Sequence, residues 1–181
     1  FFEKQTEGFE ISAINDLGNV ESNIHLYKYD TVHGKCKERI NNNSGTVTIN
    51  NQEIKFLSEP NPSKLPWRDL DIDLVIESTG FFADRNGAEK HLEAGAKKVL
   101  ISAPAKDPDF TVVYGVNDND LIDDHKIISN ASCTTNCLAP LAYLLENSVG
   151  LESGYMTTVH SVTGDQNTID TIHKDLRRAR N

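Results

Sequence analysis

The chain has 181 residues, 38% of them hydrophobic and 25% charged, which is the composition of an ordinary globular protein. Its formal net charge of -9 argues against a general nucleic-acid-binding surface, because such surfaces are basic. No run approaches the ~20 apolar residues of a membrane span. We therefore expect no nucleic-acid partner and no membrane association, in a chain long enough for one core or parts of two domains.

The three cysteines, Cys36, Cys133 and Cys137, form neither an even disulfide framework nor a paired Cys-x-x-Cys metal motif. This pattern favours a reducing cytoplasm and predicts no metal site. The first residues lack an initiator Met and the pattern of a secretory signal, and the last ones stop in a charged stretch without a helix-ending Gly or Pro. We expect truncation at both ends.

The first part of the chain predicts a strand, a helix and a hairpin. Alternation over residues 9–14 predicts a strand that ends in a turn at Asn15 and Asp16. Residues 20–29 have helical spacing. Residues 45–56 alternate on both sides of a polar turn, as in a hairpin.

The middle of the chain predicts a parallel sheet. Residues 72–77 have the pattern of a buried strand, residues 85–94 that of a helix ending at Gly95, and residues 98–102 that of the next strand. Such connections are right-handed and bring ligands to the carboxyl ends of the strands. The predicted fold class is α/β, with a Rossmann-type doubly wound, mostly parallel sheet whose N-terminal strand-helix unit is incomplete.

The last part predicts strands at residues 110–116, 127–130 and 155–162, with a helix over much of residues 133–147. Pro140 either kinks this helix or marks its first turn, and the sequence leaves both open. These elements are expected to begin an α+β domain.

Asp16 is a candidate for binding an adenosine ribose. An acidic residue at the end of an early strand accepts hydrogen bonds from the ribose hydroxyls and repels a 2′-phosphate. The alternative is an ordinary turn residue, because Asn-Asp-x-Gly favours turns locally. The Gly-rich phosphate loop that precedes such a residue would lie before Phe1.

Cys133 is the candidate nucleophile, because backbone N–H groups at the start of a helix favour a thiolate. The alternative is an inert packed thiol, which we expect of the other two cysteines. His160, 27 residues further on, is the candidate general base, or else a histidine bonded to a backbone carbonyl. Thr163 and the basic run at residues 177–180 offer either an anion site or a solvated loop.

The run Ala131-Ser132-Cys133-Thr134-Thr135-Asn136-Cys137 closely resembles the active-site signature of the glyceraldehyde-3-phosphate dehydrogenases. The likeness extends in order over nearly the whole chain, through residues 13–17, 77–82, 94–99, 101–104 and 157–180.

This resemblance implies that Cys133 attacks the aldehyde carbon of glyceraldehyde 3-phosphate, while His160 accepts the thiol proton and then hydrogen-bonds the oxyanion. Hydride passes to NAD, and inorganic phosphate converts the resulting thioester to 1,3-bisphosphoglycerate, a step of glycolysis. The implied phosphate-binding residues are Ser132 and Thr134 for the attacking phosphate, with Thr163 and Arg180 for the substrate. The implied cofactor-binding residues are Asn15, Asp16, Thr79, Gly80 and Ser102.

The resemblance further implies an NAD-binding domain over residues 1–132, lacking its first Gly-rich loop, and the beginning of the catalytic domain over residues 133–181. It implies a cytoplasmic homotetramer at full length. A polypeptide limited to these residues is expected to be inactive, because the missing loop would hold the pyrophosphate.

Two alternatives compete with this interpretation. One is erythrose-4-phosphate dehydrogenase, which shares the cysteine and histidine chemistry but ends in water attack. The other is a catalytically inactive module that only binds or assembles.

Overall fold

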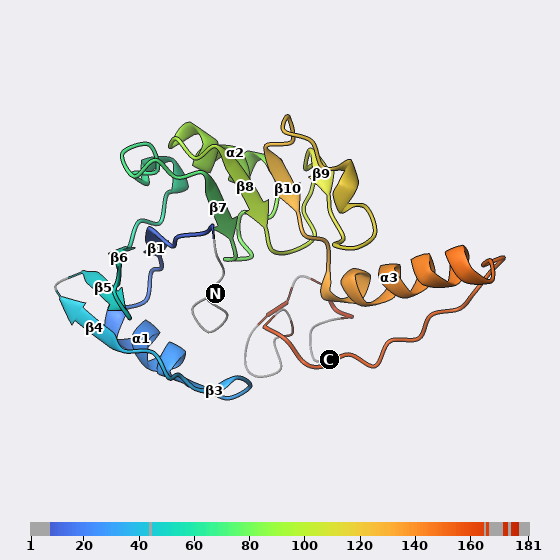
Figure 1. The fold of residues 1–181 in the computed structure, drawn as a ribbon, viewed down its shortest axis with the longest axis horizontal. Helices are drawn as coiled ribbons and strands as arrows, with labels where there is room; N and C mark the ends of the chain where they lie inside the picture. The colour runs from blue at the N-terminus through green and yellow to red at the C-terminus, as the bar shows by residue number, and fades with distance from the viewer. Residues whose placement is uncertain (1–7, 44, 165, 167–171, 174, 178–181) are drawn as a thin grey trace. The chain divides into compact units, whose positions relative to one another are not determined.

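The computed structural model describes residues 8–43, 45–164, 166, 172–173 and 175–177 (Figure 1). The chain divides into two compact units, residues 1–136 and residues 137–181, and each is described by itself. Within the described part of the chain, no helix combines the length and the apolar character needed to cross a bilayer.

The first unit contains a mixed four-stranded sheet in the order β1-β6-β5-β4. Its strands are β1 (Ala13–Asn15), β4 (Ile40–Asn43), β5 (Thr46–Ile49) and β6 (Gln52–Leu57). β1 runs parallel to β6, and β4, β5 and β6 are antiparallel neighbours. The predicted hairpin at residues 45–56 is thus confirmed. Asn50 in its turn has a φ of 56°, a conformation that asparagine tolerates.

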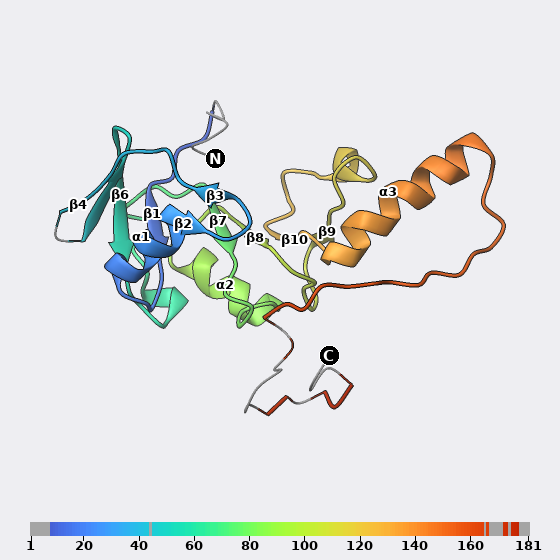
Figure 2. The same cartoon turned by 90° about the horizontal axis from the view of Figure 1, so that it is seen from below.

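One helix packs against this sheet. α1 (Val20–Lys28) lies beside it in Figures 1 and 2, as the spacing of residues 20–29 predicts. The Asn19 side chain accepts the N–H of Ser22 and so begins the helix. Ile24 packs against the core cluster of the sheet, which consists of Val47, Ile49 and Ile54. A small hairpin of β2 (Tyr29–Asp30) and β3 (Gly34–Lys35) follows.

The second sheet of the first unit is parallel throughout and has the order β7-β8-β10-β9. Its strands are β7 (Leu74–Glu77), β8 (Lys98–Ile101), β9 (Phe110–Thr111) and β10 (Ile127–Ser129). α2 (Arg85–Glu93) covers one face, where the fully buried Ala88 packs with Val99 and Ile127 (Figure 1).

Both ends of α2 follow the signals in the sequence. The Asp84 carboxylate caps its N-terminus by accepting the N–H of Gly87 at 2.7 Å. Gly95 has a φ of 112°, and a Cβ at this position would lie 2.5 Å from the Cβ of Arg68. The close approach of Arg68 and the positive φ therefore both require glycine at the end of the helix.

A third apolar cluster lies between the two sheets. Its buried members are Leu65, Trp67, Val75, Ala94 and Ala96, and Ala13 of β1 and Leu57 of β6 pack against it. Short 3₁₀ helices occur at η2 (Pro62–Lys64) and η3 (Asp118–Asp120). The α/β class with a parallel sheet is confirmed, although β1 and β7 lie at the edges of two separate sheets among the described residues.

Two predicted strands differ from the structure. Residues 113–117 form turns instead of extending β9, because the Val113 carbonyl accepts the N–H groups of Val116 and Asn117. The predicted strand at residues 155–162 is wrong: this segment has no regular secondary structure and is exposed. A strand needs a neighbour to bond its backbone groups, and no described residue pairs with this one.

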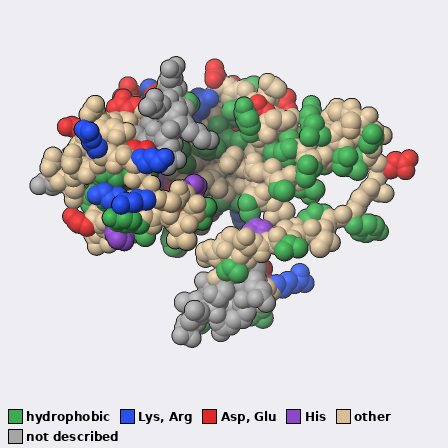
Figure 3. All heavy atoms as spheres, turned by 60° about the horizontal axis from the view of Figure 1, so that its bottom comes forward, with side chains coloured by type: hydrophobic (Ala, Val, Ile, Leu, Met, Phe, Trp, Pro, Cys, Tyr) green, Lys and Arg blue, Asp and Glu red, His purple; other side chains and the backbone are tan. Residues whose placement is uncertain are grey.

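α3 (Cys133–Ser148) begins in the first unit and continues into the second. It runs through Pro140, which therefore lies in the helix interior rather than in the first turn, and which cannot donate a bond to the Asn136 carbonyl. Leu138, Leu141 and Leu144 on this helix are exposed, and hydrophobic side chains are visible at the surface in Figure 3.

Candidate active site and cofactor-binding edge

Cys133 is the first residue of α3 and is exposed. The Ser132 hydroxyl oxygen accepts the N–H of Thr135 at 2.9 Å, and the two hydroxyls are 2.7 Å apart. Ser132 is therefore an N-cap, which leaves Cys133 and Thr134 in the first turn. The N–H groups of this first turn point towards the helix N-terminus, and together with the positive end of the helix dipole they favour a thiolate.

The segment before Cys133 is held by a buried serine. The Ser129 hydroxyl donates to the Ala103 carbonyl at 2.8 Å and accepts the N–H groups of Ala131 at 3.1 Å and Ala105 at 3.2 Å. Ala131 itself is buried with a φ of 56°, an uncommon conformation for alanine. The start of α3 is thus fixed against the loop that follows β8.

A second contact fixes the first turn of α3. The Asn136 amide donates to the Asn130 carbonyl at 2.7 Å and to the Ser132 carbonyl at 2.9 Å. Sequence reasoning missed Ser129 and Asn136 as supports. The available signal was a serine that closes the apolar run of β10, directly before the cysteine motif.

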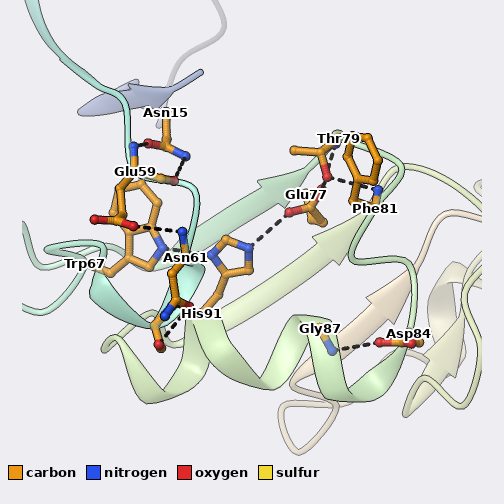
Figure 4. A network of polar contacts seen from close by, with 11 residues as sticks. Asn15, Glu59, Asn61, Trp67, Glu77, Thr79, Phe81, Asp84, Gly87 and His91 are labelled. Carbon is orange, nitrogen blue, oxygen red and sulfur yellow. Dashed lines mark hydrogen bonds and ion pairs between the residues drawn. The ribbon is translucent and has the colours of Figure 1, made fainter. Parts of the chain in front are cut away.

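Thr79 and Gly80 lie in the loop after β7, and both Thr79 donors point at one carboxylate oxygen. The Glu77 Oε1 atom accepts the Thr79 N–H at 2.7 Å and the Thr79 hydroxyl at 2.5 Å (Figure 4). The Thr79 hydroxyl oxygen in turn accepts the N–H of Phe81 at 3.1 Å. Gly80 has a φ of 75°, which suits glycine at this turn.

Glu77 continues into the core, where its other oxygen meets His91. The Glu77 Oε2 and His91 Nε2 atoms are 3.1 Å apart, and the Trp67 indole N–H donates to His91 Nδ1 at 3.0 Å (Figure 4). Burial raises the pKa of Glu77, but the hydrogen bonds from His91 and Thr79 outweigh it and hold the pKa below its usual value. Sequence reasoning missed this network, whose one local signal is a carboxylate that ends a buried strand.

Three loops meet at one edge of the parallel sheet. β7, β8 and β10 are adjacent, so the loops that begin after Glu77, Ile101 and Ser129 emerge side by side. Ser102 starts the middle loop, and its N–H donates to the Glu77 carbonyl at 3.0 Å. The structure therefore brings the loops of Thr79, Ser102 and Cys133 to the carboxyl edge, where α/β sheets bind ligands.

Asn15 and Asp16 close β1. The Asp16 Oδ1 atom accepts the Gly18 N–H at 2.7 Å and the Asn23 amide at 3.2 Å, so Asp16 forms the turn that its local sequence favours. A carboxylate accepts about four hydrogen bonds, and Asp16 is exposed, so this arrangement also fits the hydroxyl donors of a ribose. Asn15 is bonded to the backbone of Glu59.

The remaining predicted residues belong to the second unit. His160 is exposed and its Nδ1 atom lies 2.6 Å from the Ser161 carbonyl, and Thr163 donates to the Gln166 side chain. The predicted role of Arg180 lies outside the described residues. The roles of His160 and Thr163 beside Cys133 stay predictions.

The parallel sheet, its loops at the carboxyl edge and the cysteine at a helix N-terminus define an α/β protein of the Rossmann type. Matches to family models identify the particular family within this class. Residues 2–85 match the glyceraldehyde 3-phosphate dehydrogenase NAD binding domain, and residues 132–181 match the C-terminal domain of the same enzymes. The chain belongs to the glyceraldehyde-3-phosphate dehydrogenase family. NAD is the cofactor of the family domain that residues 2–85 match.

Curated relatives agree with this assignment. The chain is 53% identical over 179 residues to glyceraldehyde-3-phosphate dehydrogenase of Streptomyces coelicolor, covering 98% of this chain and 53% of the relative. It is 52% identical over 171 residues to the Xanthobacter flavus enzyme, covering 94% and 51%. It is 51% identical over 179 residues to the Thermotoga maritima enzyme, covering 99% and 54%. The chain spans about half the length of the curated relatives it matches.

Proposed function

We propose that the protein is a phosphorylating, NAD-dependent glyceraldehyde-3-phosphate dehydrogenase that converts glyceraldehyde 3-phosphate to 1,3-bisphosphoglycerate in glycolysis. One observation carries the proposal: Cys133 opens α3 at the carboxyl edge of the parallel sheet, within a motif of this family. An exposed thiol at the N-terminus of a helix is suited to attack an aldehyde carbon.

The chemistry assigns each role to a residue. The Cys133 thiolate adds to the aldehyde carbon and forms a thiohemiacetal, while His160 accepts the thiol proton and then donates to the oxyanion. Bound NAD supplies the hydride acceptor. The carbon, once oxidised, is a thioester on Cys133. Inorganic phosphate held by Ser132 and Thr134 attacks it, which releases the acyl phosphate and restores the thiolate.

Binding roles follow the same arrangement. In this proposal, Thr163 and Arg180 hold the phosphate of the substrate. Asp16 accepts hydrogen bonds from the adenosine ribose, and Asn15, Thr79, Gly80 and Ser102 form the rest of the cofactor site. The loops of Thr79 and Ser102 support this assignment, because they are neighbours on the sheet edge where dinucleotides bind.

The proposal extends to organisation. Residues 1–132 belong to the NAD-binding domain and residues 133–181 begin the catalytic domain. The complete protein is a cytoplasmic homotetramer. Gel filtration with light scattering of the full-length protein measures this state directly, and a monomer at micromolar concentration contradicts it.

A coupled assay of the full-length protein tests the reaction. NADH formation from glyceraldehyde 3-phosphate must require inorganic phosphate and yield an acyl phosphate that phosphoglycerate kinase consumes. Phosphate-independent acid formation from erythrose 4-phosphate, without acyl phosphate from the triose, contradicts the proposal. The matched control is Cys36→Ser, which removes a thiol of the β3–β4 connection and leaves α3 unchanged.

A further inference from the structure

A chain of hydrogen bonds connects the hydrophobic core to the loop of Thr79. Its three side chains come from different elements: Trp67 lies after η2, His91 in the last turn of α2, and Glu77 at the end of β7. They are 5%, 4% and 5% exposed respectively. Figure 4 shows the three side chains in one line that ends at Thr79.

The direction of each bond can be assigned from chemistry. An indole N–H only donates, so His91 Nδ1, 3.0 Å from it, must accept. An imidazole that accepts at Nδ1 is neutral and carries its proton on Nε2, and that N–H points at Glu77 Oε2 at 3.1 Å. Both bonds between Trp67 and Glu77 therefore run from Trp67 towards Glu77.

Glu77 receives donors from both sides. Its Oε2 atom accepts from His91, and its Oε1 atom accepts the N–H and the hydroxyl of Thr79. Glu77 accepts in all of these contacts, which stabilise the ionised form and keep the pKa of Glu77 below its usual value. The backbone carbonyl of Glu77 also accepts the N–H of Ser102. Glu77 thus binds Thr79 and Ser102, which lie at the beginnings of two neighbouring loops.

Burying three polar side chains in an apolar cluster is unfavourable unless each is satisfied, and apolar residues of similar volume often fold as well. Here every buried side-chain N and O atom among the described residues has a partner. A fully satisfied network of this kind fixes geometry more than it adds stability. The geometry it fixes is that of the Thr79–Gly80 turn.

We propose that Trp67, His91 and Glu77 form a directional relay that positions the loop of Thr79 for dinucleotide binding, which makes His91 and Glu77 positioning residues. The inference rests on the proposed function, since it takes this loop as part of the cofactor site. The inference requires that His91 adopts a single neutral tautomer, and that this tautomer sets the orientation of the Glu77 carboxylate.

Three substitutions separate this role from simple packing. Gln at position 91 offers one acceptor and one donor, as the neutral ring does, so His91→Gln can retain the relay, whereas His91→Leu removes both groups. Glu77→Gln keeps the shape but replaces one acceptor with a donor. Whichever way its amide turns, it faces a donor of His91 or Thr79 with a donor of its own.

The experiment measures steady-state kinetics and direct NAD titration of the full-length protein. His91→Leu and Glu77→Gln should raise the KM and the dissociation constant for NAD about tenfold, or about 1.4 kcal/mol, with kcat and the triose KM within about twofold. His91→Gln should recover most of the affinity. The control is Ile54→Val, a fully buried substitution in another cluster, which should leave NAD binding unchanged.

Two readouts make the outcome decisive. Two-bond ¹H–¹⁵N spectra of wild-type His91 should show the Nε2–H tautomer, and an Nδ1–H tautomer overturns the relay. The indole N–H signal of Trp67, the one tryptophan of the chain, should move in His91→Leu and stay near its wild-type position in His91→Gln.

The two proposals fail in different ways. If His91→Leu binds NAD more weakly than the wild type does, but the wild type does not oxidise the triose, the proposed function is contradicted and the relay is supported. A wild type that oxidises the triose while His91→Leu and Glu77→Gln bind NAD as tightly as it does overturns the relay alone.

Discussion

Asn15 and Glu59 bind each other twice across 44 residues of sequence: the Asn15 amide donates to the Glu59 carbonyl at 3.1 Å, and the Glu59 N–H donates to Asn15 Oδ1 at 2.9 Å. The Asn15 side chain thus makes the donor and acceptor bonds that a neighbouring strand would make, and it connects the end of β1 to the segment after β6. A carboxamide is needed, because the two backbone groups require one donor and one acceptor.

Asn15→Asp should lower the free energy of unfolding by about 1–3 kcal/mol, because an oxygen then faces the Glu59 carbonyl. Urea unfolding followed by circular dichroism measures the change. Asn15→Ala is the companion variant and should cost less, since it removes the donor without adding repulsion. Equal midpoints for the wild type and Asn15→Asp would exclude this role.

Cys133→Ser should reduce turnover of the full-length protein at least about a thousandfold, as expected when a covalent nucleophile is lost. Cys137→Ser, on the same helix, should retain activity within about threefold, because Cys137 is exposed and not packed as its sequence suggested.

Labelling with iodoacetamide near neutral pH tests the same cysteine without turnover. Cys133 should react fastest, since α3 favours its thiolate, whereas the Cys36 thiol lies 2.8 Å from a Glu38 carboxylate oxygen that opposes ionisation. Mass spectrometry of tryptic peptides gives the rates. Equal rates at Cys133 and Cys36 would exclude an activated nucleophile.

Asp16→Asn should relax the preference for NAD over NADP by about tenfold, because it removes the charge that repels a 2′-phosphate. The amide oxygen can still accept the Gly18 N–H, so the turn is kept. Asp30→Asn is the matched control, because Asp30 closes a similar exposed turn by accepting the N–H groups of Val32 and His33. An unchanged cofactor preference in Asp16→Asn would place the ribose elsewhere.

Asp109 should make the protein acid-sensitive in a defined range. Partial burial raises its pKa, but Arg85 and the N–H groups of Ile127 and Lys126 lower it to about 2. Because the folded pKa lies below the unfolded value of about 3.9, the contribution is complete above about pH 4 and disappears as the pH falls towards 2.

Asp109→Asn should therefore cost about 1 kcal/mol at neutral pH, after allowance for solvent screening, and should flatten the loss of stability between about pH 4 and pH 2. Urea midpoints measured across this range give the comparison. A variant whose pH profile is parallel to that of the wild type would show that Asp109 is not the responsible group.

Ser129→Ala should destabilise the protein by about 1–3 kcal/mol, since the N–H groups of Ala131 and Ala105 then lose their buried acceptor. It should also lower kcat more than the KM for NAD, because Ser129 supports the segment that leads to Cys133. Ser148→Ala, at the exposed end of α3, should change neither. Equal kcat values for Ser129→Ala and the wild type would show that Ser129 supports the fold of this segment but not catalysis.

Local signals in the sequence predicted the elements that depend on local chemistry. The spacing of residues 20–29, the turn at Asn50 and the stop at Gly95 each describe a structure that forms from neighbouring residues. The strand at residues 155–162 was predicted wrongly. Alternation of residue types indicates a segment that could form a strand, but it does not identify the neighbouring strand that must pair with it.

The same limit applies to the site. Cys133, Thr79 and Ser102 could be chosen because they follow strands or begin a helix. The link from Trp67 to His91 spans 24 residues and that from Glu77 to His91 spans 14, so only the folded sheet brings them together. A buried polar contact between distant residues leaves no periodic pattern to detect.

The backbone of Ala131 limits which substitutions this chain tolerates beside its cysteine. At a φ of 56° a β-branched side chain is strongly disfavoured, and the position is only 6% exposed, so a larger residue also meets neighbouring atoms. Glycine relieves the strain most fully, but it increases the conformational entropy of the unfolded chain. Libraries that aim to alter specificity around Cys133 should therefore vary the exposed residues of the three loops and keep position 131 fixed.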